Sequence, residues 1–131
     1  MNTRIEYLYR DASNYKSWNK EIISGEMTKD DVIRIQMCLL DGEYFVPRDV
    51  GLPETRITDY RTDDDHCWFE WELGEDEYDG SLFGVELTNE SPTLQMTVNE
   101  LVRNFESVKS WDETSWMNDY EYMSYDELFE E

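Results

Sequence analysis

Negative charge constrains this chain more strongly than any other feature of its sequence. The 131 residues include 32 Asp and Glu against 11 Lys and Arg, for a formal net charge of −21. Repulsion among so many like charges opposes collapse and is typical of disordered chains. Disordered acidic chains are poor in aromatic residues, however, and here 15% of the residues are Phe, Trp or Tyr. Because aromatic side chains bury large areas in a core, we expect a folded acidic protein.

The charge is unevenly distributed along the chain. Residues 1–61 hold nine basic and eleven acidic side chains, whereas residues 62–131 hold two basic and 21 acidic ones. The first part is therefore nearly neutral, and the second carries almost all of the negative charge. Such asymmetry points to an interaction surface in the second part. It argues against adaptation to high salt, which would spread acids over the whole chain, while a role in solubility alone stays open.

The length and the hydrophobic pattern predict a single α+β domain over residues 1–131. Helix-capping residues precede apolar residues at helical spacing, which predicts one helix from Thr28 to a C-cap at Gly42 and another beginning at Thr97. We expect the two helices to pack on a mainly antiparallel sheet. Alternating polar and apolar residues predict its strands at 5–9, 16–23, 44–46, 67–73 and 82–87.

Two further segments have a distinctive composition. Prolines bracket residues 47–53, which predicts a rigid loop. Residues 110–131 interleave aromatic residues with acids, and we expect this C-terminal segment to pack through its aromatic side chains. Ser124, three residues before Glu127, predicts a last helical turn.

The sequence favours a cytoplasmic protein. Its N-terminal residues lack the apolar centre of a secretory signal, and no apolar run approaches the ~20 residues that cross a bilayer. Cys38 and Cys67 lack the spacing of a zinc site or a disulfide framework, so we expect two buried, reduced thiols. Anionic lipids would repel the acidic surface, and contacts to phosphates need clustered Lys and Arg. We therefore expect neither membrane binding nor direct nucleic-acid binding.

No residue pattern predicts an enzyme or a cofactor. His66, the only histidine, lies in a run of charged residues rather than beside a candidate Ser or Cys nucleophile elbow. The six glycines occur singly, so there is no phosphate-binding loop. Carboxylate pairs are uninformative in a chain so rich in acids.

One metal site is kept as an alternative. Glu75, Glu77, Asp79 and Glu86, with Gly80 between them, have the spacing of an EF-hand calcium loop. Glu75 stands where the shorter aspartate is expected, and the preceding residues 68–73 are typical of a strand rather than of an entering helix. We therefore expect an exposed hairpin turn here.

The acidic residues themselves are the strongest functional feature. Glu70 and Glu72 are two apart in a predicted strand, which spaces their carboxylates by about 6.6–6.8 Å, roughly as successive phosphates are spaced. A protein with such a field of anions is expected to mimic nucleic acid and to block the Arg- and Lys-lined groove of a basic nucleic-acid-binding protein. The residues expected to contact this partner are Asp63, Asp64, Asp65, Glu70, Glu72, Glu75, Asp76, Glu77, Asp79, Asp119, Glu121, Asp126, Glu127, Glu130 and Glu131. A general protein-interaction module using the aromatic tail is the alternative.

Two segments in the first part carry a resemblance to other proteins: RIEYLYRDASNYK (4–16) followed by Trp18-Asn19, and EYFVPRDVGLP (43–53). They resemble segments of small uncharacterised proteins of bacteria and their mobile elements, and this resemblance implies no activity. In size and acidity the chain also resembles phage-encoded DNA-mimic inhibitors, including anti-CRISPR and anti-restriction proteins. That resemblance implies an inhibitor of a bacterial defence or DNA-processing protein.

Overall fold

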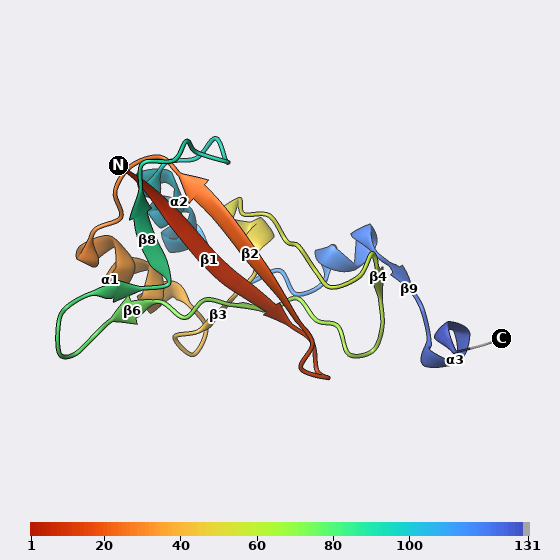
Figure 1. Cartoon of the computed structure of the whole chain (residues 1–131). Coiled ribbons are helices and arrows are strands. Elements are labelled where there is room, and N and C mark those ends of the chain that lie inside the picture. The colour runs from red at the N-terminus through yellow and green to blue at the C-terminus, as the bar shows by residue number, and fades with distance from the viewer. Residues whose placement is uncertain (130–131) are drawn as a thin grey trace.

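A hairpin of two long strands lies at the centre of the computed structural model, which describes residues 1–129 (Figure 1). Strands β1 (Asn2–Arg10) and β2 (Lys16–Ile23) pair in antiparallel fashion, with Arg10 opposite Lys16 at the turn. Ile5, Tyr7 and Tyr9 are fully buried on one face, which confirms the predicted alternation. The hairpin therefore presents one face to the core and one face away from it.

The other edge of β1 pairs with two short strands. β5 (Phe69–Glu70) lies beside Leu8 and Tyr9, and β8 (Val85–Thr88) lies beside the first half of β1. β3 (Tyr44–Phe45) extends the sheet beyond β5, and all of these pairings are antiparallel. The α+β fold with a mainly antiparallel sheet is thus confirmed.

Two predicted strands are shorter than expected. In residues 67–73 only β5 joins the sheet, although Cys67, Phe69, Trp71 and Leu73 are all buried as the alternation predicted. Residues 82–87 are divided at Gly84: β7 (Leu82–Phe83) pairs with β6 (Gly74–Glu75) in a separate hairpin, and β8 follows.

Gly84 explains this division. Its φ of +85° lies in the left-handed region, and a Cβ there would meet the Glu72 carbonyl oxygen at 2.3 Å. The Gly84 carbonyl accepts the indole N–H of Trp71 at 3.0 Å and the backbone N–H of Glu6 at 3.4 Å. The chain therefore bends where a continuous strand would have run.

Two helices cover the buried face of the hairpin. α1 (Lys29–Cys38) begins with the Thr28 cap, which exchanges two hydrogen bonds with Asp31, and buries Val32 and Ile35. It ends one turn before the expected C-cap, so that Gly42 lies in the turn that follows.

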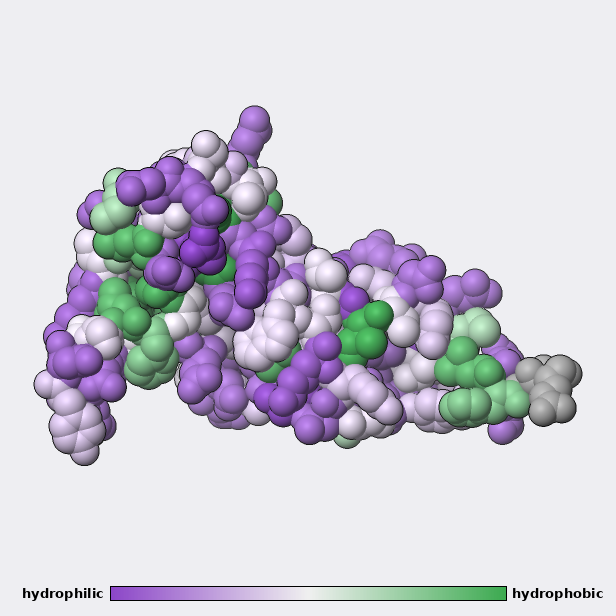
Figure 2. Space-filling view, viewed as in Figure 1, coloured by the Kyte–Doolittle hydropathy of each residue, from purple (hydrophilic) through white to green (hydrophobic). Residues whose placement is uncertain are grey.

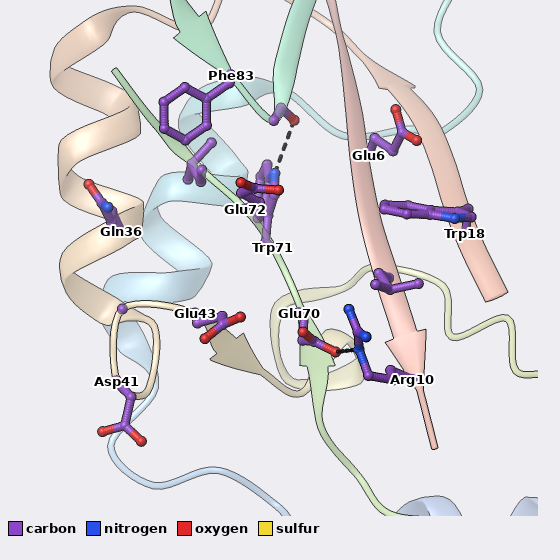
Figure 3. A pocket seen from close by; sticks show the side chains of 14 residues that line it. Glu6, Arg10, Trp18, Gln36, Asp41, Glu43, Glu70, Trp71, Glu72 and Phe83 are labelled. Atoms are coloured by element: carbon purple, nitrogen blue, oxygen red, sulfur yellow. Dashed lines mark hydrogen bonds and ion pairs between the residues drawn. The ribbon is translucent and has the colours of Figure 1, made fainter. Parts of the chain in front are cut away.

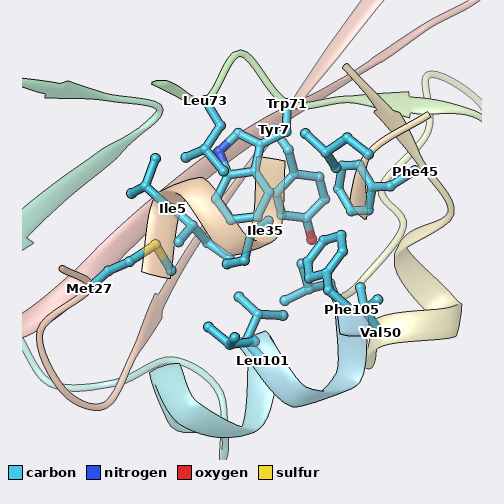
Figure 4. Close-up of a cluster of buried hydrophobic side chains, with 14 of the residues drawn as sticks. Ile5, Tyr7, Met27, Ile35, Phe45, Val50, Trp71, Leu73, Leu101 and Phe105 are labelled. Atoms are coloured by element: carbon cyan, nitrogen blue, oxygen red, sulfur yellow. The ribbon is translucent and has the colours of Figure 1, made fainter. Parts of the chain in front are cut away.

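The second helix follows its prediction closely. α2 (Val98–Ser107) begins after Thr97, whose hydroxyl accepts the Glu100 N–H, and it buries its apolar stripe. Residues from both helices and the sheet meet in one core (Figure 4), which includes Ile5, Tyr7, Ile35, Phe45, Trp71, Leu101 and Phe105. The expected loop at 47–53 begins as a short 3-10 helix, η1 (Pro47–Val50).

The C-terminal segment lies at the opposite end of the molecule from α1 (Figure 1). It consists of the 3-10 helix η2 (Ser115–Asp119), strand β9 (Glu121–Tyr122) and helix α3 (Tyr125–Leu128), which Ser124 caps. β9 pairs in parallel with β4 (Tyr60–Arg61). Trp116 is 1% exposed and forms a second buried cluster with Val46 and Cys67. The expected packing through aromatic side chains is confirmed for Trp111, Trp116 and Tyr120, whereas Tyr122, Tyr125 and Phe129 are exposed.

Both cysteines are free thiols. Cys67 is buried as expected, and burial raises its pKa to about 12, whereas Cys38 is only half-buried. Within residues 1–129, no helix has the length and apolar character needed to cross a membrane.

Candidate acidic binding surfaces

Two acidic groups expected from the sequence meet at one end of the molecule. The Tyr122 hydroxyl donates to Asp63 at 2.9 Å, and the Tyr125 hydroxyl donates to Asp64. These contacts join the 62–66 loop to the segment after η2, and a Met123 N–H bond to the Arg61 carbonyl at 2.8 Å reinforces them. We call the resulting surface the acidic end, formed by Asp63, Asp64, Glu121, Asp126 and Glu127.

Hydrogen bonds keep the Asp64 carboxylate of the acidic end in place and ionised. Asp64 accepts the Ser13 hydroxyl at 2.6 Å as well as that of Tyr125, and these two bonds lower its pKa. The nearby Arg61 donates to the Tyr120 carbonyl and lies 5.2 Å from the centre of the Tyr122 ring. This guanidinium is therefore directed to the chain's own tail.

Several residues expected to contact a partner instead hold the fold together. Asp65 accepts the Tyr9 hydroxyl at 2.5 Å and the Thr62 N–H at 2.8 Å. Asp119 forms an ion pair with Arg48 at 2.9 Å. Glu130 and Glu131 lie outside the described residues.

A buried arginine supports the acidic end from within. The Arg56 guanidinium lies 4.2 Å from the centre of the Trp116 ring and 4.6 Å from that of Tyr9, and Nη1 donates to the His66 carbonyl. Its side chain is 3% exposed, and Nη2 lies 3.5 Å from the equally buried Glu54. Sequence reasoning missed Arg56, because nothing local distinguishes it from a surface arginine. The only available signal was the abundance of Trp and Tyr in the C-terminal segment.

A second acidic surface is a groove of about 790 Å³ at the side of the sheet (Figure 3). It lies between the face of the hairpin turned away from the core and the turn after α1. We call it the acidic groove. Its exposed apolar side chains are Trp18 and Phe83, the buried Leu8, Trp71 and Leu73 lie beneath it, and its carboxylates come from Glu6, Asp41, Glu43, Glu70 and Glu72. Hydrophobic and hydrophilic groups lie side by side on the face of the molecule shown in Figure 2.

The predicted contact residues Glu70 and Glu72 both line this groove, but they differ in availability. Glu70 is half-buried and accepts the Nε–H of Arg10 at 3.0 Å. Glu72 is exposed. Asp41 and Glu43, which the sequence did not suggest, line the same groove from the turn after α1.

The remaining predicted acids lie in the β6–β7 hairpin and are mostly engaged with their own turn. Glu75 pairs with Lys29 at 2.8 Å, and Asp76 accepts two backbone N–H groups of the turn. Asp79 accepts the N–H and hydroxyl of Ser81, and these bonds lower its pKa. Glu77 is exposed.

The geometry gives no support to the calcium alternative. Glu75 is paired with Lys29, Asp79 with its own turn, and Glu86 with Arg4. No group of three or more His, Cys, Asp or Glu is placed to hold a metal ion in residues 1–129. Apart from Asp65 and Asp119, which hold the fold, the predicted acids among the described residues are thus distributed over three places: the β6–β7 hairpin, the acidic groove and the acidic end.

No protein-family model matches this chain, and no curated protein or solved structure is significantly similar to it. The resemblances to small bacterial proteins and to DNA-mimic inhibitors therefore stay predictions. The proposed function therefore rests on the geometry and charge of the acidic surfaces.

Proposed function

We propose that the protein is a non-enzymatic nucleic-acid mimic that binds a basic nucleic-acid-binding protein and blocks its polynucleotide groove. The observation that most supports this is the acidic end, where carboxylates from distant segments share one surface. The two tyrosine–aspartate bonds that build it join residues 59 and 61 positions apart. A bacterial defence or DNA-processing protein, as for anti-CRISPR or anti-restriction inhibitors, is the partner class that charge and size favour.

Fixed carboxylates suit this role for a physical reason. A side chain that is already held in place loses less conformational freedom when it binds. Opposite potentials also steer two proteins together, so association should be fast and should weaken as salt is added. The acidic end meets both conditions through Asp63 and Asp64, and the exposed Glu121, Asp126 and Glu127 add charge beside them.

The experiment uses bacterial lysate proteins retained on immobilised duplex DNA. The protein is added at low salt, and the released DNA-binding proteins are identified and quantified. The acidic-end variant Glu121→Gln/Asp126→Asn/Glu127→Gln is compared with a helix variant, Asp30→Asn/Glu100→Gln/Glu106→Gln. Both variants lose three negative charges, but the second loses them from α1 and α2.

The proposal expects the natural protein and the helix variant to release the same DNA-binding proteins, and the acidic-end variant to release much less. Equal loss of release in both variants would mean that total charge, rather than one surface, is responsible, and equal release by all three proteins would mean that the acidic end is not the contact surface. If neither the natural protein nor either variant releases proteins from the DNA, the proposed function is wrong.

The aromatic tail supports a second candidate only in a narrower form. Trp116 and Tyr120 pack around Arg56, so their role is structural. Tyr125 and Phe129 form a stacked pair with ring centres 6.5 Å apart, and Phe129 is 81% exposed. If this pair anchors a partner, Phe129→Ser should abolish binding at low and high salt alike, whereas loss of acidic contacts matters mainly at low salt.

A further inference from the structure

We infer that the acidic groove binds an extended cationic polypeptide segment of the partner, in which Arg or Lys side chains are interspersed with apolar ones. This inference rests on the proposed function and names the kind of segment that the basic partner presents. It concerns a surface separate from the acidic end.

The charge of the groove selects a cationic occupant. Arg10, the one basic residue of its lining, is already hydrogen-bonded to Glu70. The exposed carboxylates of Asp41, Glu43 and Glu72 form no ion pair with any of residues 1–129. Three negative charges therefore border one concavity without a cation of their own.

The exposed aromatic rings of the groove favour a segment that contains apolar side chains as well as positive charge. Trp18 is 55% exposed and Phe83 is 43% exposed, although both are large apolar side chains. Aromatic faces attract guanidinium and ammonium groups. Contact with aliphatic side chains also removes their apolar surface from water, which favours binding. The stems of Arg and Lys can lie along such rings while their charged ends reach the carboxylates at the border. The volume of the groove is within the range of protein ligand sites.

Hydrogen bonds hold the groove in shape without a ligand. The Trp71 backbone N–H donates to the Glu43 carbonyl at 2.9 Å, and its indole donates to the Gly84 carbonyl at 3.0 Å (Figure 3). The Phe83 ring lies directly over Gly74, where an added Cβ would stand 2.7 Å from it. A groove that is already formed binds with less loss of entropy than one that must be ordered.

The test uses the hexapeptide Arg-Leu-Arg-Leu-Arg-Leu, acetylated and amidated, titrated into the ¹⁵N-labelled protein at low salt. We expect NMR shifts at the Trp18 indole N–H and at the Gly42 and Gly84 amides. The peptide Arg-Gly-Arg-Gly-Arg-Gly has the same charge but no apolar side chains, and it should bind about tenfold more weakly.

Variants separate the groove from the acidic end. Glu43→Gln/Glu72→Gln should weaken binding of the leucine peptide about tenfold, because two of the three unpaired charges are lost. Trp18→Ala should weaken it as well. The acidic-end triple variant is the control and should bind the peptide as the natural protein does. Dispersed NMR spectra will establish that each variant is folded.

Two results would overturn the inference: shifts confined to the acidic end, or equal affinity for the leucine and glycine peptides. Failure of the two proposals is distinguishable. If the peptide binds in the groove but no protein is released from DNA, the groove inference stands and the proposed function as a nucleic-acid mimic is wrong. If proteins are released from DNA but the peptide does not bind, the proposed function stands and the groove inference is wrong.

Discussion

The main core and the small cluster beneath the acidic end are built from different chemistry. The main core joins aliphatic and aromatic side chains of the sheet and both helices. The small cluster packs on a cation at its border with the main core, because Arg56 lies over the Trp116 and Tyr120 rings of the small cluster as well as over the Tyr9 and Phe69 rings of the main core. One region is therefore stabilised by removal of apolar area from water, and the other also by attraction between a charge and aromatic faces.

This difference gives the two regions separate sensitivities. Loss of main-core packing should unfold the whole protein, since every long strand and helix contributes to it. Loss of the Arg56 contacts should loosen the C-terminal segment before the rest, because regions with fewer buried apolar contacts open at lower free energy. The acidic end depends on that segment.

The largest effect is expected for Phe105→Ala. Phe105 is 1% exposed and contacts the rings of Phe45, Trp71 and Trp111. Removal of a buried phenyl ring leaves a cavity and should lower the free energy of unfolding by about 3–5 kcal/mol. Urea denaturation followed by tryptophan fluorescence measures it. A loss below about 1 kcal/mol would contradict the assignment of this core.

Arg56→Met should have a smaller and more local effect. The substitution keeps an apolar chain of similar length but removes the charge that faces the rings and Glu54. Because Glu54 keeps its bonds to Arg48, we expect a loss of about 2 kcal/mol rather than that of a fully orphaned buried charge. Hydrogen exchange should rise in residues 111–123 and stay unchanged in α2.

Arg34→Met is the matched control for this prediction. Arg34 also pairs with a carboxylate, Glu106, but both side chains are exposed. Exposed ion pairs contribute about 0–1 kcal/mol, so this variant should be close to the natural protein. Equal stability of the Arg56 and Arg34 variants would contradict the proposed difference between the two regions.

The smallest effect is a pH dependence at the acidic end. Hydrogen bonds from Ser13 and Tyr125 lower the pKa of Asp64 in the folded protein. A carboxyl group of this kind stabilises the fold above its unfolded pKa of about 4, and that contribution is lost as the pH falls through the folded pKa. Tyr125→Phe should therefore be less stable at about pH 6, and its difference from the natural protein should shrink below about pH 4.

NMR titration of the Asp64 carboxyl group provides the direct measurement. Its pKa should be higher in Tyr125→Phe than in the natural protein, while that of Asp79, which depends on Ser81, should be unchanged. An unaltered Asp64 titration would mean that the tyrosine does not hold this carboxylate.

Local signals made much of the fold predictable. The alternation of Ile5, Tyr7 and Tyr9 gives the first strand, and Thr28 and Thr97 mark the starts of the helices, because hydrogen-bonding side chains at these positions satisfy free backbone N–H groups. The pattern from Cys67 to Leu73 also predicted which side chains are buried. It overestimated the strand because Gly84 and β8 occupy the edge of β1 beyond Leu8: the Glu6 N–H donates to the Gly84 carbonyl, and Ile5 pairs with Val85.

The binding surfaces were predictable only as a list of acids. Which acids meet depends on contacts between distant residues, such as Tyr122 with Asp63, and no local pattern encodes these. Asp65 and Asp119 have the same composition signal as Asp63 but serve the fold. Asp41 and Glu43 were overlooked because they belong to the nearly neutral first part of the chain, and only the folded turn brings them to the groove.

The contact between Trp71 and Gly84 has a consequence for evolution. In a mutant library selected only for correct folding, exposed Glu77 and Tyr78 should accept many replacements, but position 84 should return glycine almost every time. Any side chain there would strike the passing backbone and displace the indole. A tryptophan followed thirteen positions later by an invariant glycine would therefore mark distant sequences that share this architecture.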